Sequence, residues 1–458
     1  MKERLKTSLI ILLFCCLTFM ASQIWLVGPR QEAFLEPVTP KPTRDEEPLE
    51  EFLSPRRALL NFGNQEHTLV YDAQEIWAGY YPILKQSFDL GEENLAPSWE
   101  GISWEAYMDL QNEPSLVFKM ENPYHGRLLG ELLGLSDLSW GPLKEVYFPV
   151  DGAYFILVTE GGQARVRLED RSMQDMTRYL QSVYKEASYV SYGSLWEAYG
   201  QAKQAYFPKE AQPAPVQPIY QDETDFLSPE YAMDLAQRFL ARPLEDIQII
   251  GEREANLYVY GQKSLRLSRW GHLDYQDASP VASDSQIEDL DALYLALRFI
   301  GNKVGITQGL VLDQIKKDQG AWILTFNKKE GGWVVKPLEE GAYLRLKIRN
   351  NQVQSFSMTY RVHSEEGAPG PETDQVLPAF MDLVEARLAS GDPFPGQGLS
   401  LEEFMGGLDQ VDLVYLDPTE IDRAPLQMAY EVHWQGQVFY MDPQGGQVIE
   451  RGDPDGLV

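Results

Sequence analysis

The uncharged run from Ser8 to Val27 constrains this chain more than any other feature of the sequence. As an α-helix, a run of this length spans about 30 Å, which is the thickness of the hydrocarbon core of a bilayer. A secretory signal has a shorter apolar core of roughly 7–15 residues before small residues, and the letters MAS at positions 20–22 match that pattern poorly. The run therefore predicts a permanent transmembrane helix over residues 8–27, buried in the lipid bilayer.

The residues around the span predict its orientation. Lys2, Arg4 and Lys6 lie on its amino-terminal side, and basic residues favour the cytoplasmic face. We therefore expect a single-pass protein of the cell membrane with residues 1–7 in the cytoplasm and the bulk of the chain outside. A lipoprotein signal needs a small residue before the cysteine, whereas Phe14 precedes Cys15. That alternative is rejected.

One face of the predicted helix is a candidate contact surface, which we call the seam. Its members recur at alternating steps of three and four residues, as in a heptad repeat, and four of the six are small or hydroxylated. Small residues let a second transmembrane helix approach closely, which favours a partner-binding face. Their hydroxyl groups can instead bond back to their own helix, and this alternative remains open. The seam consists of Ser8, Ile11, Cys15, Thr18, Ser22 and Trp25.

Composition limits what the external part can be. Both cysteines lie inside the span, so the external part can form no disulfide and depends on hydrophobic cores. The chain carries a formal net charge of −30 although its first 27 residues are net positive. Nucleic acid is therefore excluded as a partner, because its phosphates would be repelled. A solvated surface is favoured over an acidic recognition patch as the reason for this acidity.

Two proline-rich stretches divide the external part. Residues 28–53 read as an extended acidic tether and residues 208–224 as a linker. Between them, residues 54–207 are predicted to form an N-terminal α/β domain, with a hairpin at Gly63-Asn64. A central α/β domain (225–283) and a C-terminal one (284–458) follow.

The chain after the linker repeats one plan, in which a helix precedes antiparallel hairpins. Ser228 and Pro229 open the first helix, Ser285 and Glu288 form a capping box at the start of the second, and VLPAFMDLVEARLASG forms the third. The short runs between them alternate like strands. Helices on one face of antiparallel sheets predict an α+β fold class.

The sequence offers no specific catalytic, cofactor-binding or metal-binding motif. Its five histidines are scattered, and none lies in a zinc-protease or serine-hydrolase context. His67 and His433 fall in predicted strands, which favours hydrogen-bonded structural imidazoles. Paired carboxylates for glycoside hydrolysis stay open, because an acidic chain contains many chance pairs.

Several segments together resemble the YycH regulatory proteins. They are KTSLIILLFCCLTFMASQIW, SPRRALLNFGNQEHTLVY, LRLSRWGHLDY and AYEVHWQGQVFYMDPQGGQVIE. Their order and spacing over nearly the whole chain, rather than any single motif, carry the resemblance. The last segment also looks like the end of a YycI or PepSY module.

The resemblance implies a non-enzymatic regulator in the cell membrane. Its partners would be a WalK- or YycG-like sensor histidine kinase and a YycI-like membrane protein, and its output would be control of cell-wall metabolism. No catalytic residue and no cofactor is carried over. Two alternatives remain open: an anchored, wall-facing glycan hydrolase that uses paired carboxylates, and a PepSY-like module that binds a secreted peptidase.

Overall fold

The computed structural model divides the chain into two compact units, Met1–Thr43 and Arg44–Val458. All described residues belong to the second unit, and no helix among them is long and apolar enough to cross a membrane. The predicted span and its seam lie outside the described residues. The structure describes residues 55, 57–89, 100–124, 143–150, 154–159, 162–167, 189–200, 205–213, 218–222, 228–268, 271–280, 287–305, 309–338, 342–363, 376–390, 395, 398–418 and 424–449.

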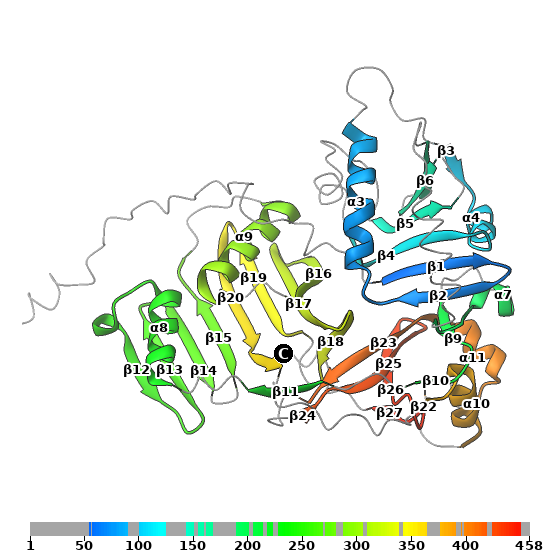
Figure 1. The fold of residues 1–458 in the computed structure, drawn as a ribbon. Coiled ribbons are helices and arrows are strands. Elements are labelled where there is room, and N and C mark those ends of the chain that lie inside the picture. The colour runs from blue at the N-terminus through cyan, green and yellow to red at the C-terminus, as the bar shows by residue number, and fades with distance from the viewer. Residues whose placement is uncertain are drawn as a thin grey trace, which may run out of the picture. The chain divides into compact units, whose positions relative to one another are not determined.

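The described chain is a mixed α+β structure built on large antiparallel sheets, which confirms the predicted fold class at that level (Figure 1). A nine-stranded sheet comes first, in the order β3-β7-β6-β5-β4-β1-β2-β8-β9. Its strands are β1 Arg57–Gly63, β2 Glu66–Val70, β3 Glu100–Ile102, β4 Ser115–Tyr124, β5 Leu143–Pro149, β6 Tyr154–Thr159, β7 Gly162–Arg167, β8 Tyr192–Ser194 and β9 Tyr206–Pro208. Helices α3 (Gln74–Asp89), α4 (Trp104–Leu110) and α7 (Leu195–Tyr199) accompany it.

The predicted hairpin near Gly63-Asn64 is confirmed as the β1–β2 connection. Asn64 and Gln65 both have positive φ, 53° and 63°. Two successive left-handed residues match the right-handed twist of the strands that they join, and asparagine adopts this conformation more readily than most residues. A local turn signal therefore determined this pairing.

A thirteen-stranded sheet follows, in the order β12-β13-β14-β15-β20-β19-β17-β18-β23-β25-β26-β27, with β16 also paired to β17. Its strands are β12 Gln248–Gly251, β13 Ala255–Tyr260, β14 Lys263–Ser268, β15 His272–Asp277, β16 Leu310–Asp318, β17 Ala321–Glu330, β18 Trp333–Pro337, β19 Leu344–Arg349, β20 Gln352–Thr359, β23 Leu408–Asp417, β25 Gln427–Trp434, β26 Gln437–Met441 and β27 Val448–Ile449.

Two small sheets and five helical segments complete the described elements. Strands β21 (Arg361–His363), β11 (Ile219–Asp222) and β24 (Ala424–Pro425) form one small sheet, and β10 (Gln212–Pro213) pairs with β22 (Val376–Leu377). The helical segments are α8 Pro229–Leu240, the 3₁₀ turn η2 Leu244–Asp246, α9 Asp289–Lys303, α10 Phe380–Ser390 and α11 Leu401–Gly407.

The large sheet continues across the predicted boundary between residues 283 and 284. Strand β15 precedes that boundary and pairs antiparallel with β20, which follows it. Further along the sheet, β18 pairs parallel with β23 although more than seventy residues separate them. Such pairings join segments that are distant in the sequence, so the local pattern used for the domain division did not contain them.

Helices α8 and α9 contact one another and lie against different strands of the large sheet, α8 against β13 and β14 and α9 against β17 and β19 (Figure 1). The predicted start of α8 is confirmed, because the Ser228 side chain accepts a hydrogen bond from the Tyr231 amide and Pro229 is the first helical residue. Phe239 of α8 packs against Tyr275 of β15 and Phe356 of β20, with ring centroids 5.4 and 5.5 Å apart. In β19 the buried leucine and isoleucine side chains alternate with exposed Arg345, Lys347 and Arg349, as expected where only one face of a sheet is covered.

Candidate functional site

His67 and His433 are hydrogen-bonded within the fold. In β2, the His67 Nδ1 atom lies 2.7 Å from the Asn61 side chain and Nε2 lies 2.5 Å from the Glu197 carboxylate. In β25, His433 lies 3.3 Å from Glu431. The prediction of hydrogen-bonded imidazoles at both positions is confirmed. No group of three or more His, Cys, Asp or Glu side chains within the described ranges is arranged to hold a metal ion.

Three buried carboxylates in the described part, Asp417, Glu145 and Glu431, are paired with basic side chains. Asp417 and Arg361 are both fully buried, and Asp417 also accepts a hydrogen bond of 2.5 Å from the Tyr343 hydroxyl. Two further buried carboxylates, Glu145 and Glu431, lie 2.9 and 2.8 Å from lysine Nζ atoms. These three carboxylates are therefore held in ion pairs with a basic side chain.

Lys328 lies beside the same cluster. Its ammonium group donates to the Arg361 carbonyl oxygen and lies over the rings of Tyr220 and Tyr343. Burial lowers the pKa of Lys328 to about 8, and the neighbouring Asp417 opposes this effect. The cluster joins β17, β11, β21 and β23, so its charges link strands that are distant in the sequence.

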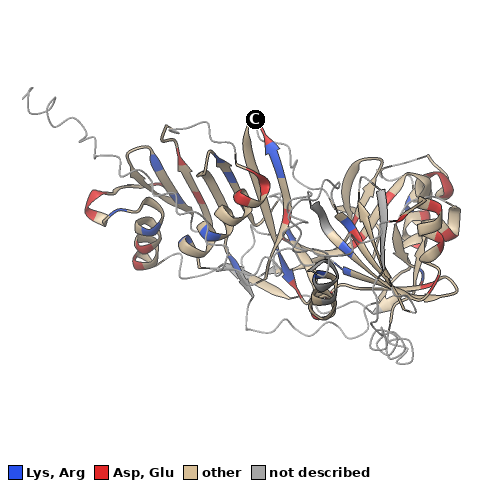
Figure 2. Cartoon of the chain, turned by 90° about the horizontal axis from the view of Figure 1, so that it is seen from above, with Lys and Arg blue, Asp and Glu red and all other residues tan. Residues whose placement is uncertain are grey.

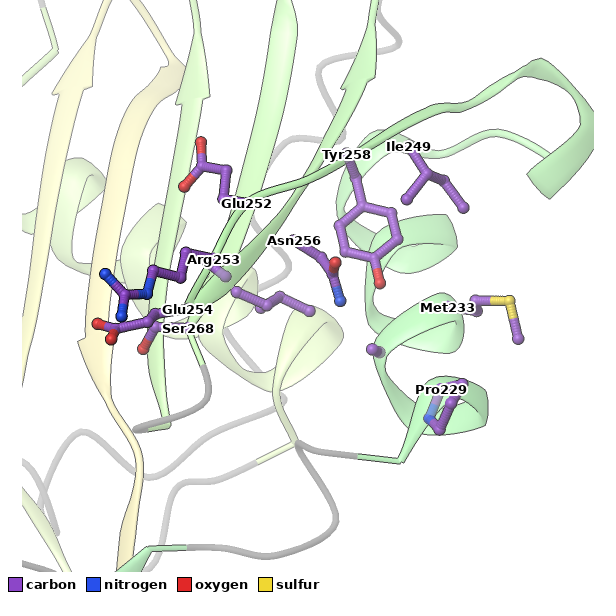
Figure 3. Close-up of a pocket in the computed structure, with 12 residues that line it drawn as sticks. Pro229, Met233, Ile249, Glu252, Arg253, Glu254, Asn256, Tyr258 and Ser268 are labelled. Atoms are coloured by element: carbon purple, nitrogen blue, oxygen red, sulfur yellow. The ribbon is translucent and has the colours of Figure 1, made fainter.

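An open groove lies between α8 and the strands β12, β13 and β14, and it is the candidate functional site (Figure 3). Its volume is about 420 Å³. Pro229 and Met233 line it from α8, while Ile249 and Tyr258 line it from the strands. The groove is lined by both apolar and polar side chains, a common character of binding sites.

Strand β12 forms one wall of the groove and is the last strand of its sheet. Within the described residues it pairs only with β13, in the continuous register from Gln248↔Val259 to Gly251↔Asn256. All four of its residues are exposed, and Ile249 and Ile250 keep 50% and 41% of their surface in water. Single exposed apolar residues are ordinary, but two adjacent isoleucines on an open strand edge are not.

The hydrogen-bond pattern of the β12–β13 hairpin shows which backbone groups are free. The Glu252 amide donates to the Ala255 carbonyl oxygen at 2.9 Å, which makes these two residues a hydrogen-bonded pair. Such pairs alternate along an antiparallel ladder. Ile250 therefore bonds inward to β13, while Ile249 and Gly251 direct their N–H and C=O groups away from the sheet.

Acidic residues surround this edge. Glu245 and Asp246 precede β12 in the exposed turn η2, and Glu252 and Glu254 follow it. Glu252 is paired with Arg266 of β14 at 3.0 Å. Figure 2 shows acidic and basic residues mixed over the other helices and strands. The excess of acidic residues near β12 is one part of the net negative charge of the chain.

Sequence reasoning located the strand but not the site. The run IQIIGE alternates like a strand, whereas nothing in it indicates an edge position, since edge and central strands share the same side-chain period. The sequence feature that could have indicated a binding edge is the pair of adjacent isoleucines, Ile249 and Ile250, between acidic residues. The predicted seam, Ser8, Ile11, Cys15, Thr18, Ser22 and Trp25, lies outside the described residues and stays a prediction.

Comparison with known proteins identifies no family. No protein-family model matches the chain, and no curated protein matches it in sequence. The YycH resemblance therefore gains no support from them. Two solved structures are distantly similar. An uncharacterized protein from Eubacterium rectale shares 9% identity over 52% of this chain and 86% of its own, with a TM-score of 0.31.

The second is the C-terminal domain of YpeB from Bacillus megaterium. It shares 13% identity over 49% of this chain and 96% of its own, with a TM-score of 0.29. Both scores are too low to assign a shared fold or a shared function.

Proposed function

We propose that this protein is a membrane-anchored, extracytoplasmic regulator that acts by binding other proteins. In this proposal residues 8–27 anchor the chain, and the described residues lie outside the cell. The observation that carries it is the groove between α8 and the free edge of β12, because an exposed edge and an adjacent pocket suit the recognition of a polypeptide.

The resemblance to YycH proteins supplies the partners of the proposal. They are a WalK- or YycG-like sensor histidine kinase and a YycI-like membrane protein, and the regulated process is cell-wall metabolism. The same groove is also compatible with a PepSY-like module that binds a secreted peptidase. The glycan hydrolase gains less support, because the buried carboxylates described above are neutralised by cations rather than facing each other across a cleft.

Co-purification tests the proposal. The full-length chain carrying a C-terminal affinity tag would be extracted from its native membrane in mild detergent, and its companions identified by mass spectrometry. We expect a sensor histidine kinase at a near-stoichiometric level, and its absence would contradict the kinase assignment. Recovery of a secreted peptidase instead would favour the second candidate. Hydrolysis of purified cell-wall glycan by the chain, lost on changing one carboxylate, would contradict both.

A further inference from the structure

We propose that β12 receives an extended segment of a partner protein as an additional antiparallel or parallel strand, and that this segment carries basic residues on both sides of the paired stretch. This inference rests on the proposed function, since it names how the regulated partner is held. The juxtaposition that carries it is a strand edge with which no other described strand pairs, a groove on one face of that edge, and acidic residues at both of its ends.

The backbone of β12 offers hydrogen-bonding groups that no other described residue uses. Ile249 and Gly251 alternate with residues bonded to β13, so each directs one N–H and one C=O group outward. Up to four main-chain hydrogen bonds are available to an added strand. Peptide recognition by strand addition obtains its affinity from such main-chain bonds.

Apart from its short length of four residues, β12 shows none of the usual protections of an edge, and no other described strand pairs with it. Exposed edges are commonly protected by lysine, proline, a β-bulge or an inward-pointing charge. The sequence of β12 is QIIG, and its register with β13 is uninterrupted. Ile249 and Ile250 point to opposite faces, so an incoming strand would find an apolar neighbour on each side of the sheet.

Gly251 provides a second, independent observation. Its φ is not in the left-handed region, and a Cβ atom at this position would meet its nearest neighbour, Asn256 Oδ1, only at 4.0 Å. Neither the backbone conformation nor the packing of this chain requires glycine there. Glycine within a strand often marks a place where another backbone approaches closely, and here the approach would come from the open edge.

The groove would accept alternate side chains of the added strand. Ile249 lies on the α8 side of the sheet, opposite the buried Tyr258 in the ladder. Met233 and Pro229 of α8 form the opposite wall (Figure 3). A side chain of the partner strand on this face would therefore enter between β12 and α8, and an apolar, β-branched side chain suits such a surface.

The charges near β12 favour a segment of another protein over a second copy of this chain as the added strand. Within the described residues, Glu245, Asp246 and Glu254 form no ion pair, whereas Glu252 is bonded to Arg266. Arg253 lies between the two glutamates of the hairpin tip, which keeps a net negative charge. Antiparallel pairing of two copies through β12 would bring the acidic turn of one copy close to the acidic hairpin tip of the other. Like charges placed opposite one another are destabilising. A partner segment with lysine or arginine flanks is favoured instead.

A peptide selection tests this mode of binding. The full-length chain in detergent micelles would be presented with a displayed library of random 12-residue peptides. We expect the enriched peptides to alternate β-branched and polar residues and to carry Lys or Arg at both ends. A synthetic copy of one such peptide would then be titrated against the wild type and three variants.

Ile249→Pro removes an outward amide that the fold does not use, and Ile249→Lys adds a charge that repels basic flanks. Both should weaken binding at least about tenfold. Val376→Lys is the matched control, because Val376 is a similarly exposed apolar strand residue (55%) on β22 and should change nothing. The unfolding transition of each variant would show that the fold is kept.

Alternate N-methylation of the peptide separates strand addition from other modes. An added strand uses the amides of one edge only, so methylating one alternate set should abolish binding and methylating the other should leave it unchanged. Equal tolerance of both sets, equal binding to both Ile249 variants, or failure to enrich any peptide would overturn the inference. So would self-association of the chain that Ile249→Pro abolishes.

The two proposals fail in different ways. If a kinase co-purifies equally with wild type and Ile249→Pro, the regulator proposal stands and strand addition is wrong. If peptides bind β12 as expected but no kinase is recovered, strand addition stands and the kinase assignment is wrong.

Discussion

Arg361 and Asp417 form a fully buried ion pair, in which the guanidinium Nη2 and Nε atoms lie 3.1 and 3.2 Å from the two carboxylate oxygens. The pair joins β21 to the end of β23, and Arg361 also donates to the Tyr220 carbonyl oxygen on β11. Three strands from distant parts of the sequence therefore meet at one bidentate contact.

Removing the acid of this pair should be strongly destabilising. Asp417→Asn removes the carboxylate that pairs with Arg361 and also acts on the neighbouring buried Lys328, and breaking such a buried pair typically costs about 3–5 kcal/mol. Urea unfolding measures the loss. Asp234→Asn is the control, since its pair with Arg238 on α8 is largely exposed and should contribute less than about 1 kcal/mol. Equal losses in the two variants would contradict this account.

Replacing both members of the pair tests whether the charge or the contact matters. The double variant Arg361→Met with Asp417→Leu removes both buried charges, and similar replacements elsewhere are often neutral or stabilising. We expect it to recover most of the stability lost in Asp417→Asn, measured by the same unfolding experiment. A double variant as unstable as the single one would show that the guanidinium contacts themselves hold the strands together.

Lys328 should make stability depend on pH in the alkaline range. Its pKa is about 8 in the folded chain and higher when unfolded, because burial disfavours the ammonium ion. Between pH 8 and about 10 the unfolded state therefore binds more protons, and the free energy of unfolding should rise with pH by up to about 1.4 kcal/mol per unit from this group. Below pH 8 this contribution is constant and unfavourable.

Comparison of variants isolates this contribution. Lys328→Met should reduce the slope between pH 8 and 9.5, whereas Lys316→Met, which removes an exposed lysine of β16, should not. Measurements should stop below pH 10, because the pKa values of Tyr220 and Tyr343 are raised by burial and nearby carboxylates. Their titration in the unfolded state lowers stability at higher pH. A slope unaffected by Lys328→Met would show that the ammonium is not desolvated.

The anchor prediction concerns residues 8–27. Because this run is as long as the bilayer core and has basic residues before it, the protein should keep its amino terminus. Terminal sequencing of the chain purified from membranes is the measurement. A mature terminus between Ala21 and Gly28 would show that the segment is a cleaved signal.

The seam is tested separately from export. Replacing Cys15, Thr18 and Ser22 together by Leu should weaken co-purification of the kinase, because bulky side chains prevent close helix approach. In the matched control variant, Leu9, Leu13 and Leu17 on other faces of the helix are replaced together by Ala. This variant should co-purify with the kinase almost as well as the wild type. Loss of the kinase only in this second variant would show that the opposite face of the helix makes the contact.

Local sequence signals determined the elements that depend on neighbouring residues. Ser228 and Pro229 predicted the start of α8, and the turn residues after β1 predicted the first hairpin, because capping and turn conformations involve only a few consecutive residues. The alternation in LRLKIR likewise matches the buried and exposed residues of β19. From such patterns the α+β class follows.

Only the tertiary structure decided the order of the strands, and with it the candidate site. Side-chain alternation tells which face of a strand is buried, but it carries no information about which strand lies beside it. The open edge at β12, the parallel contact of β18 with β23 and the pairing of Arg361 with Asp417 all depend on segments distant in the sequence. Their stability comes from burial and long-range charge pairing, which exist only once the chain has folded.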